Sequence, residues 1–331
     1  MWFIQTGKAS LHPSCSRVWY NGSARQVMNI LRRAIPSLQE VHMFYALSLL
    51  AGMMISVMVV FNGGLNAQVG FGLSLVVIHI AGLVTIALVM LMKREKPVFP
   101  KMPPFWYTAG LLGILTTVFN LLAFGHISVS AMMALGLLGE SMSSLFADHT
   151  GLLGIPVRKM RKEKVAGLVI ILAGIVIMMT DFVLVPVLVS FMAGITVLLS
   201  RVINGGLARK SSITSATLIN YLTGLLGAIV AAAFIGVPTP IPAQGPITNY
   251  LGGAVGAIIV IISNFVVGKI ASFYMTLTLF VGQVSAGLLL DMMLQGFFPV
   301  RIALGGLCVL LGLTLNLLQD RAYALKTGRE F

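Results

Sequence analysis

From residue 42 to residue 319 the chain consists of long apolar runs separated by short links that are polar or contain glycine. A helix that crosses a membrane needs about 20 consecutive, mostly apolar residues. This criterion predicts ten membrane-spanning helices and therefore an all-α integral membrane protein. The helices are expected near residues 42–62, 72–92, 106–124, 127–147, 164–181, 183–203, 214–236, 249–267, 271–290 and 301–319.

The predicted helices form two sets of five that repeat one another. Residues 139–148 recur as residues 282–291, a displacement of 143 positions (282 − 139). The sequence NGGL at 62–65 recurs at 204–207, a displacement of 142 (204 − 62). Ungapped similarity of this length, with shared glycine and polar residues, is the signature of an internal duplication.

The odd number of helices in each unit determines the expected architecture. Two homologous five-helix units in one chain must lie upside down relative to each other in a membrane. Inverted repeats of this kind are typical of secondary transporters, and their substrate site lies near mid-membrane at the interface between the repeats. The sequence therefore predicts two inverted five-helix repeats.

Composition agrees with a membrane protein. Hydrophobic residues make up 58% of the chain and charged residues only 9%, against roughly 25% charged residues in soluble domains; the mean hydropathy is +0.98. A net charge of +13 would suggest nucleic acid in a soluble protein, but cytoplasmic loops of membrane proteins collect Lys and Arg. With both termini in the cytoplasm, 21 of the 22 basic residues fall inside and only Arg301 outside, so no nucleic-acid partner is expected.

The predicted organisation has four parts: a basic cytoplasmic extension at 1–41, a first repeat at 42–181, a second repeat at 182–319 and a cytoplasmic tail at 320–331. The extension is compatible with three interpretations. It is a basic amphipathic helix on the membrane surface, a disordered tail, or the product of a start codon assigned too early.

Glu140 is the main candidate functional residue, because it lies about 13 residues into its predicted helix and so roughly 20 Å along it. A charged side chain in hydrocarbon is unfavourable by roughly 2.5–3.5 kcal/mol on insertion scales. Burial favours the protonated carboxyl, whereas a cationic substrate favours the ionised form. This opposition is the physical basis of proton-for-substrate exchange. The alternative is a protonated Glu140 that hydrogen-bonds across a helix contact.

Further polar positions within the predicted helices are candidates to bind substrate or protons with Glu140: Gln283, His79, Tyr221, Asn120, Asn264, Asn62 and Asn204. Gln283 is the repeat equivalent of Glu140 and cannot titrate, so proton coupling would depend on Glu140 alone. His79 either relays protons or bonds a neighbouring carbonyl. Asn62 and Asn204 are expected to end the first helix of each repeat as caps followed by glycine.

Small residues at a spacing of four predict close helix packing in both repeats: Gly139 and Ser143 in the first, Gly282 and Ala286 in the second. Such residues let helix backbones approach closely in membranes.

An Asp at the end of each of these helices is followed by a basic residue, giving the pairs Asp148 with Arg158 and Asp291 with Arg301. We expect interfacial ion pairs that fix each helical hairpin; the alternative is that these pairs form gates.

Several of these features together resemble a known family: the NGGL end of the first helix, the Gly-Glu or Gly-Gln helix, the GLLGIP turn at 151–156 and the closing glycine-rich helix. Over about residues 43–319 the chain is similar to the tandem form of the YdcZ-type branch of the drug/metabolite transporter superfamily. The resemblance implies a ten-helix carrier of the bacterial inner membrane, commonly labelled an exporter.

The expected function is a secondary-active transporter, driven by protons, that exports a small metabolite or drug-like molecule through the lipid bilayer. The alternative is a non-transporting scaffold or a subunit of a membrane complex. The sequence contains no metal-ligand spacing, phosphate loop or nucleophile motif, and its two cysteines, Cys15 and Cys308, form no framework. No enzyme activity, cofactor or metal site is therefore expected. The sequence leaves the oligomeric state open.

Overall fold

The computed structural model describes residues 38–150, 164–178, 183–236, 245–266, 269, 272–296 and 299–327. Most of the predicted extension lies outside these residues. Contacts divide the chain into two units, Met1–Phe44 and Tyr45–Phe331. In the first unit only the beginning of one helix is described. All packing discussed below belongs to the second unit.

The described residues contain ten long α-helices and two short 3₁₀ helices. The first repeat has α2 (Leu38–Val69), α3 (Phe71–Lys93), α4 (Ala109–Ala123), α5 (Val129–Thr150) and α6 (Lys164–Met178). The second has α7 (Leu184–Lys210), α8 (Ile213–Ile235), α9 (Gly252–Val266), α10 (Ser272–Gln295) and α11 (Val300–Thr327). The 3₁₀ helices η1 (Pro104–Tyr107) and η3 (Ile247–Leu251) precede α4 and α9. The prediction of an all-α fold with ten helices is confirmed.

Within the part of the chain that the structure describes, five helical segments are long and apolar enough to cross a membrane, by length and composition: His42–Val69, Phe71–Lys93, Leu184–Lys210, Ile213–Ile235 and Ile247–Val266. Four shorter apolar helices accompany them. Many large apolar side chains are exposed, among them Met92, Phe234 and Met293. Side chains of this kind are compatible with contact with lipid tails rather than with water.

The ends of the first helix of each repeat differ from the prediction. Asn62 and Asn204 do not cap these helices, because α2 continues to Val69 and α7 to Lys210. The glycines that follow each Asn remain helical, and three of the four leave space for a neighbouring side chain. A side chain at Gly206, for example, would clash with the Trp106 ring of η1. Tertiary packing, rather than chain termination, explains Gly63, Gly64 and Gly206, whereas no atom lies near a Cβ at Gly205.

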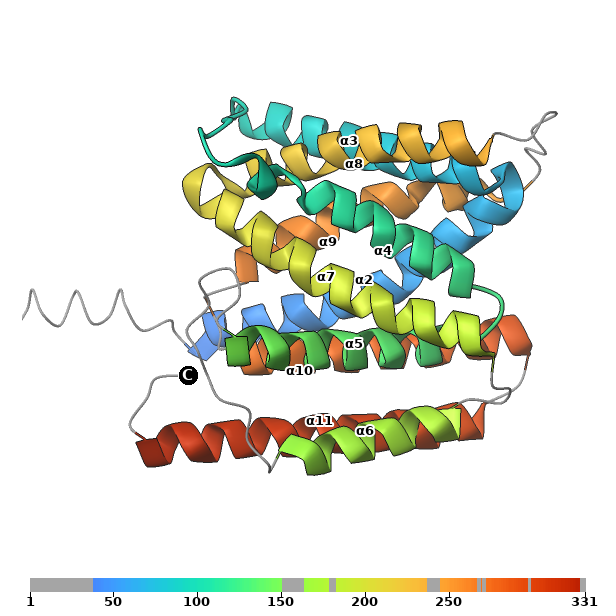
Figure 1. Ribbon diagram of the computed structural model, residues 1–331, viewed down its shortest axis with the longest axis vertical. Helices are drawn as coiled ribbons and strands as arrows, with labels where there is room; N and C mark the ends of the chain where they lie inside the picture. Colours follow the sequence, from blue (N-terminus) through green and yellow to red (C-terminus); the bar gives the residue numbers. More distant parts are fainter. Residues whose placement is uncertain are drawn as a thin grey trace, which may run out of the picture. The chain divides into compact units, whose positions relative to one another are not determined.

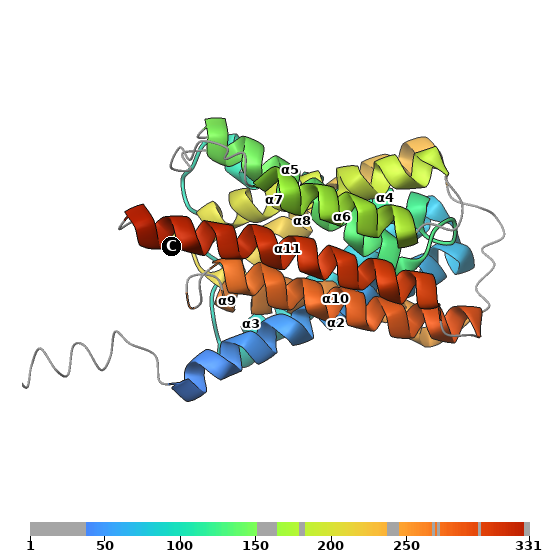
Figure 2. The same ribbon diagram turned by 90° about the horizontal axis from the view of Figure 1, so that it is seen from below.

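The helices pack with an internal two-fold pseudosymmetry that exchanges the repeats. Three helices contact their own repeat equivalents: α3 packs on α8, α5 on α10 and α6 on α11. The contact of α3 with α9 is mirrored by that of α8 with α4. In Figures 1 and 2 the α6–α11 pair lies at one end of the helix stack, and Figure 1 has the α3–α8 pair at the other.

Two glycine pairs give the relative direction of the repeats. A Cβ atom at Gly82 would clash with the Tyr221 ring, and one at Gly224 would approach the His79 ring. Residue 79 thus lies beside 224 and residue 82 beside 221, so α3 and α8 are antiparallel. Gly167 lies beside the side chain of Asn316 and Gly174 beside Gly305, so α6 and α11 are antiparallel too. Equivalent helices that run in opposite directions are what an inverted repeat requires.

Very close backbone approaches are also repeated. Gly194 of α7 faces the Gly136 carbonyl of α5, and Gly52 of α2 faces the equivalent carbonyl, that of Leu279 in α10. In both places a Cβ atom would overlap the carbonyl oxygen, so only glycine allows the helices to cross at this distance.

Two of the four residues predicted to mediate helix packing, Gly139 and Gly282, lie at these same crossings. Gly139 faces the carbonyl of Phe191, and Gly282 faces that of Leu49. The hydroxyl of Ser143 donates to the Gly139 carbonyl of its own helix at 2.7 Å, and Ala286 is buried.

Candidate functional site

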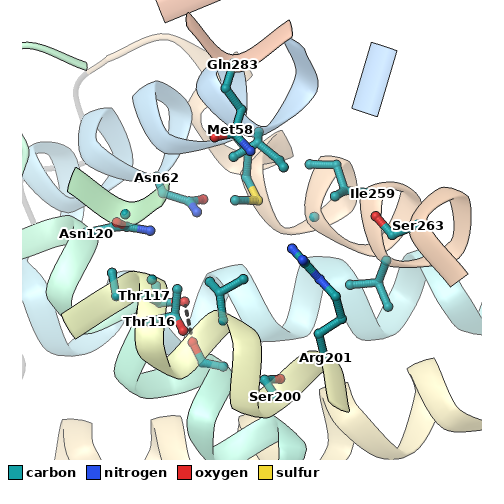
Figure 3. A pocket seen from close by; sticks show the side chains of 18 of the residues that line it. Met58, Asn62, Thr116, Thr117, Asn120, Ser200, Arg201, Ile259, Ser263 and Gln283 are labelled. Atoms are coloured by element: carbon teal, nitrogen blue, oxygen red, sulfur yellow. Dashed lines mark hydrogen bonds between the residues drawn. The ribbon is translucent and has the colours of Figure 1, made fainter. Parts of the chain in front are cut away.

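A cavity of ≈ 270 Å³ lies at the interface between the two repeats. Its described lining comes from the first four helices of each repeat, α2 to α5 and α7 to α10, and not from the α6–α11 pair. The pseudosymmetry axis brings these eight helices together, so neither repeat forms the cavity alone. Figure 3 shows this cavity with side chains from both repeats directed into it.

The structure brings together in this cavity all eight residues proposed from sequence to bind substrate or protons: Glu140, Gln283, His79, Tyr221, Asn120, Asn264, Asn62 and Asn204. They come from α2, α3, α4, α5, α7, α8, α9 and α10. Their common location is a finding, whereas their role as ligands stays a prediction.

A single ion pair connects the two repeats across the described cavity wall. Arg201 of α7 donates from Nη1 to Oε1 of Glu140 in α5. The Glu140 side chain is 18% exposed and that of Arg201 31%. Both groups are thus shielded from bulk solvent but reachable from the cavity. In Figure 3 Arg201 extends into the cavity from one wall, opposite Met58 and Gln283.

Arg201 lines the cavity but was not predicted from the sequence as a site residue. It was assigned to the cytoplasmic basic residues because it lies two positions from the predicted end of its helix, at 203. Since α7 continues to Lys210, Arg201 lies two and a half turns inside the helix. One sequence signal was available. The equivalent position in the first repeat is Val59 (201 − 142), so a charge replaces an apolar residue there.

Asparagine side chains give the cavity wall unused hydrogen-bonding capacity. Within the described part of the chain, Oδ1 of Asn62, Oδ1 of Asn204, Oδ1 of Asn220 and Nδ2 of Asn264 are buried without a partner. Buried polar groups in native proteins are nearly always hydrogen-bonded. Four exceptions that line one cavity therefore indicate groups that a ligand or water would satisfy.

His79 and Tyr221 serve the crossing of α3 and α8 as well as lining the cavity. Nδ1 of His79 lies 2.8 Å from the Leu75 carbonyl of its own helix, which is the simpler of its two predicted roles. The Tyr221 hydroxyl lies 3.3 Å from the Gly253 carbonyl and donates to it. The two rings are 5.9 Å apart between centroids. Both side chains thus have structural partners.

Hydrogen bonds of hydroxyl groups connect α4 and α7, which form one wall of the cavity. The hydroxyls of Thr116 and Thr196 lie 2.7 Å apart, and Ser200 donates to the Ala109 carbonyl at 2.9 Å. Thr116 and Ser200 also line the cavity. These bonds position α7, and with it Arg201, against the first repeat.

Asp291 has a different partner from the one predicted. Its carboxylate accepts from the backbone N–H groups of Val129 at 2.8 Å and Ser130 at 3.0 Å, and it is buried at 2% exposure. Asp291 of α10 therefore caps α5, where unpaired N–H groups and the helix dipole favour an anion. The exposed Arg301 is not its partner in the described structure. The pair of Asp148 with Arg158 stays a prediction, because Arg158 lies outside the described residues.

No group of three or more His, Cys, Asp or Glu side chains that could hold a metal ion occurs among the residues described.

Comparison with known proteins gives one family and a structural relative. The family described as "Putative inner membrane exporter, YdcZ" matches residues 43–177 and again residues 185–315. No curated protein matches the chain. A solved structure described only as "Crystal structure of protein" has 16% sequence identity and a TM-score of 0.55, covering 87% of this chain and 99% of its own. That likeness concerns the fold alone.

Proposed function

Because the chain belongs to the YdcZ family of inner-membrane exporters, in a tandem form with two family domains, we propose that it is a secondary-active transporter of a small molecule. The substrate binds in the cavity between the repeats, and the two inverted repeats alternate in exposing it to either side of the membrane. Both termini lie in the cytoplasm, in keeping with the distribution of basic residues.

The observation that carries this proposal is the cavity itself, with a shielded Glu140–Arg201 pair and unpartnered amide groups in its wall. A scaffold has no need of such groups, since buried polar atoms without partners destabilise a fold. A transporter needs groups that are satisfied by substrate when it is present and by water when it is absent.

Proton coupling is proposed for Glu140. It is the one carboxylate of the described cavity wall, and it forms an ion pair with the Arg201 guanidinium. Proton binding to Glu140 neutralises it and releases Arg201. Proton, substrate and Arg201 therefore compete for a single carboxylate, and such competition is what exchange of a proton for a substrate requires.

Access to the cavity tests the transport function against the scaffold alternative. In a background with Cys15 and Cys308 replaced by serine, a single cysteine is introduced at Gln283 or at Asn120. We expect each to react with a membrane-impermeant thiol reagent. A cysteine at Ile171, which is fully buried outside the cavity, is the control and should stay protected. Protection at both cavity positions would favour a scaffold.

Coupling is tested in everted membrane vesicles supplied with a bacterial metabolite extract, with uptake measured by mass spectrometry. We expect accumulation of at least one compound to require an imposed pH gradient and to be lost in Glu140→Gln. Glu95→Gln, in the link between α3 and η1, is the matched control and should retain it. Gradient-dependent uptake that persists in Glu140→Gln would remove Glu140 from the coupling mechanism.

A further inference from the structure

The two charges of the cavity wall come from different repeats, and each occurs once. Glu140 has the neutral Gln283 as its repeat equivalent, and Arg201 has the apolar Val59. The pseudosymmetry of the backbone therefore does not extend to the charges. In the described cavity the charges form one complementary pair, so a ligand meets an anionic and a cationic group side by side.

A ligand that carries one kind of charge separates this pair at a cost. A cation bound to Glu140 leaves the guanidinium of Arg201, which is always charged, without a counter-ion. An anion bound to Arg201 leaves the Glu140 carboxylate unpaired. Leaving one partner of a shielded ion pair uncompensated is strongly unfavourable. A ligand with both charges replaces the internal pair with two new pairs and leaves no charge unpaired.

The surroundings of the pair fit the same chemistry. Asn62, Asn204 and Asn220 of the cavity wall carry amide oxygens without a partner, and such oxygens are the acceptors that an ammonium or hydroxyl group requires. Met58 and Ile259, both visible in Figure 3, give the opposite wall an apolar surface. A volume of ≈ 270 Å³ lies just below the range of ligand sites, about 300–1,000 Å³, and favours a small ligand. The cavity thus fits a small ligand that carries both charges and a short apolar part.

We propose that this transporter selects small amphoteric substrates, whose anionic group binds Arg201 and whose cationic group binds Glu140. This inference rests on the proposed transport function and assigns its substrate class. Arg201 determines specificity in this scheme. In the empty cavity Arg201 pairs with Glu140. A bound substrate then supplies a cationic group for Glu140 and an anionic group for Arg201.

Three sets of probes with matched carbon chains test the proposal: ω-amino carboxylates of two to five carbons, the corresponding fatty acids, and the corresponding alkylamines. Binding to the purified full-length protein is measured by calorimetry at neutral pH. For the wild type we expect at least one amino carboxylate to bind on the order of tenfold more tightly than both of its singly charged analogues.

Variants of the pair show whether the charges cause this preference. Arg201→Gln is expected to shift the preference to the alkylamine, and Glu140→Gln to the fatty acid. The exchanged variant Glu140→Arg with Arg201→Glu should retain preference for the amino carboxylate. Arg209→Gln, an exposed change near the end of the same helix, is the matched control and should bind as the wild type does. If the single variants do not fold, the exchanged variant and Arg201→Lys still decide the outcome.

Equal or tighter binding of a singly charged analogue by the wild type would overturn the proposed substrate class. Failure of every probe to bind, while cysteines in the cavity still react with the thiol reagent, would overturn it as well and leave the transport function standing. Protection of those cysteines would instead contradict the transport function.

Discussion

Comparing the two repeats position by position separates what the duplication preserved from what it changed. Gly194 of the second repeat meets a backbone carbonyl of α5, and Gly52 of the first meets the equivalent carbonyl of α10. In the cavity, by contrast, Glu140 corresponds to Gln283, and Arg201 corresponds to Val59.

The difference reflects the physical demands on each kind of position. A helix crossing without space for a Cβ atom accepts glycine and nothing else, whichever repeat it belongs to. A cavity wall accepts many side chains, so the two halves are free to differ. One repeat then supplies the carboxylate and the other the guanidinium. The backbone symmetry supports alternating access, and the asymmetry gives the site its chemistry.

The largest expected effect comes from breaking the shared helix crossings. Gly194→Ala places a methyl group against the Gly136 carbonyl, and we expect a loss of about 3 kcal/mol or more, at the upper end of overpacking costs. Gly52→Ala should cost a similar amount, because its surroundings are equivalent. Thermal unfolding in detergent measures both.

Gly205→Ala is the control for these changes, since no atom lies near its added methyl group and alanine favours a helix over glycine. Its thermal stability should equal or exceed that of the wild type. Equal losses in all three variants would mean that the close helix crossings do not determine the result.

Making the two repeats chemically alike is the next test. Arg201→Val copies Val59, and Glu140→Gln copies Gln283. Each single change should lower stability by about 2 kcal/mol, less than the 3–5 kcal/mol for a fully buried pair, because both groups are partly exposed. The double variant should recover most of this stability and still fail to transport. Thermal unfolding and vesicle uptake, measured on the same preparations, check the two statements separately. Additive losses in the double variant would mean that the pair contributes little.

Variants of Asp291 and Arg301 distinguish the observed helix cap from the ion pair that was predicted between these two residues. Asp291→Asn loses the charge at the start of α5 and one of its two acceptors, so we expect a loss of about 1–2 kcal/mol. Arg301→Gln is expected to stay within about 0.5 kcal/mol of the wild type, as exposed substitutions usually do. Thermal unfolding compares them; similar losses in both variants would support an Asp291–Arg301 hairpin pair instead of the cap.

The smallest expected effect concerns the threonine pair between α4 and α7. Thr116→Val removes the 2.7 Å contact with Thr196 and should cost about 0.5–1.5 kcal/mol, typical of one hydrogen bond. Thr85→Val removes only a bond to a carbonyl of its own helix and is the matched control. A larger loss for Thr85→Val in thermal unfolding would argue against a role for the interhelical bond.

Sequence reasoning predicted the helices and the cavity-lining positions better than it predicted the partners of side chains. Glu140 and Gln283 were identified because a polar residue in an apolar run is conspicuous and the repeat relates them. Asn62 and Asn204 were identified as well, but with helix ends at the wrong place, since a pair of glycines after Asn is typical of a cap. Arg201 was missed for the same reason, because the predicted end of its helix lay too early.

The sequence by itself determined the ten helices, their grouping into two repeats and the expectation of inversion, because each depends only on the length, spacing and order of apolar segments along the chain. Only the tertiary structure decided that Arg201 pairs with Glu140 and that Asp291 caps α5. Those partners lie 61 and 162 positions apart in sequence. Which of them meet depends on how each helix is rotated and where it crosses its neighbours, and those crossings are set by packing across the whole bundle.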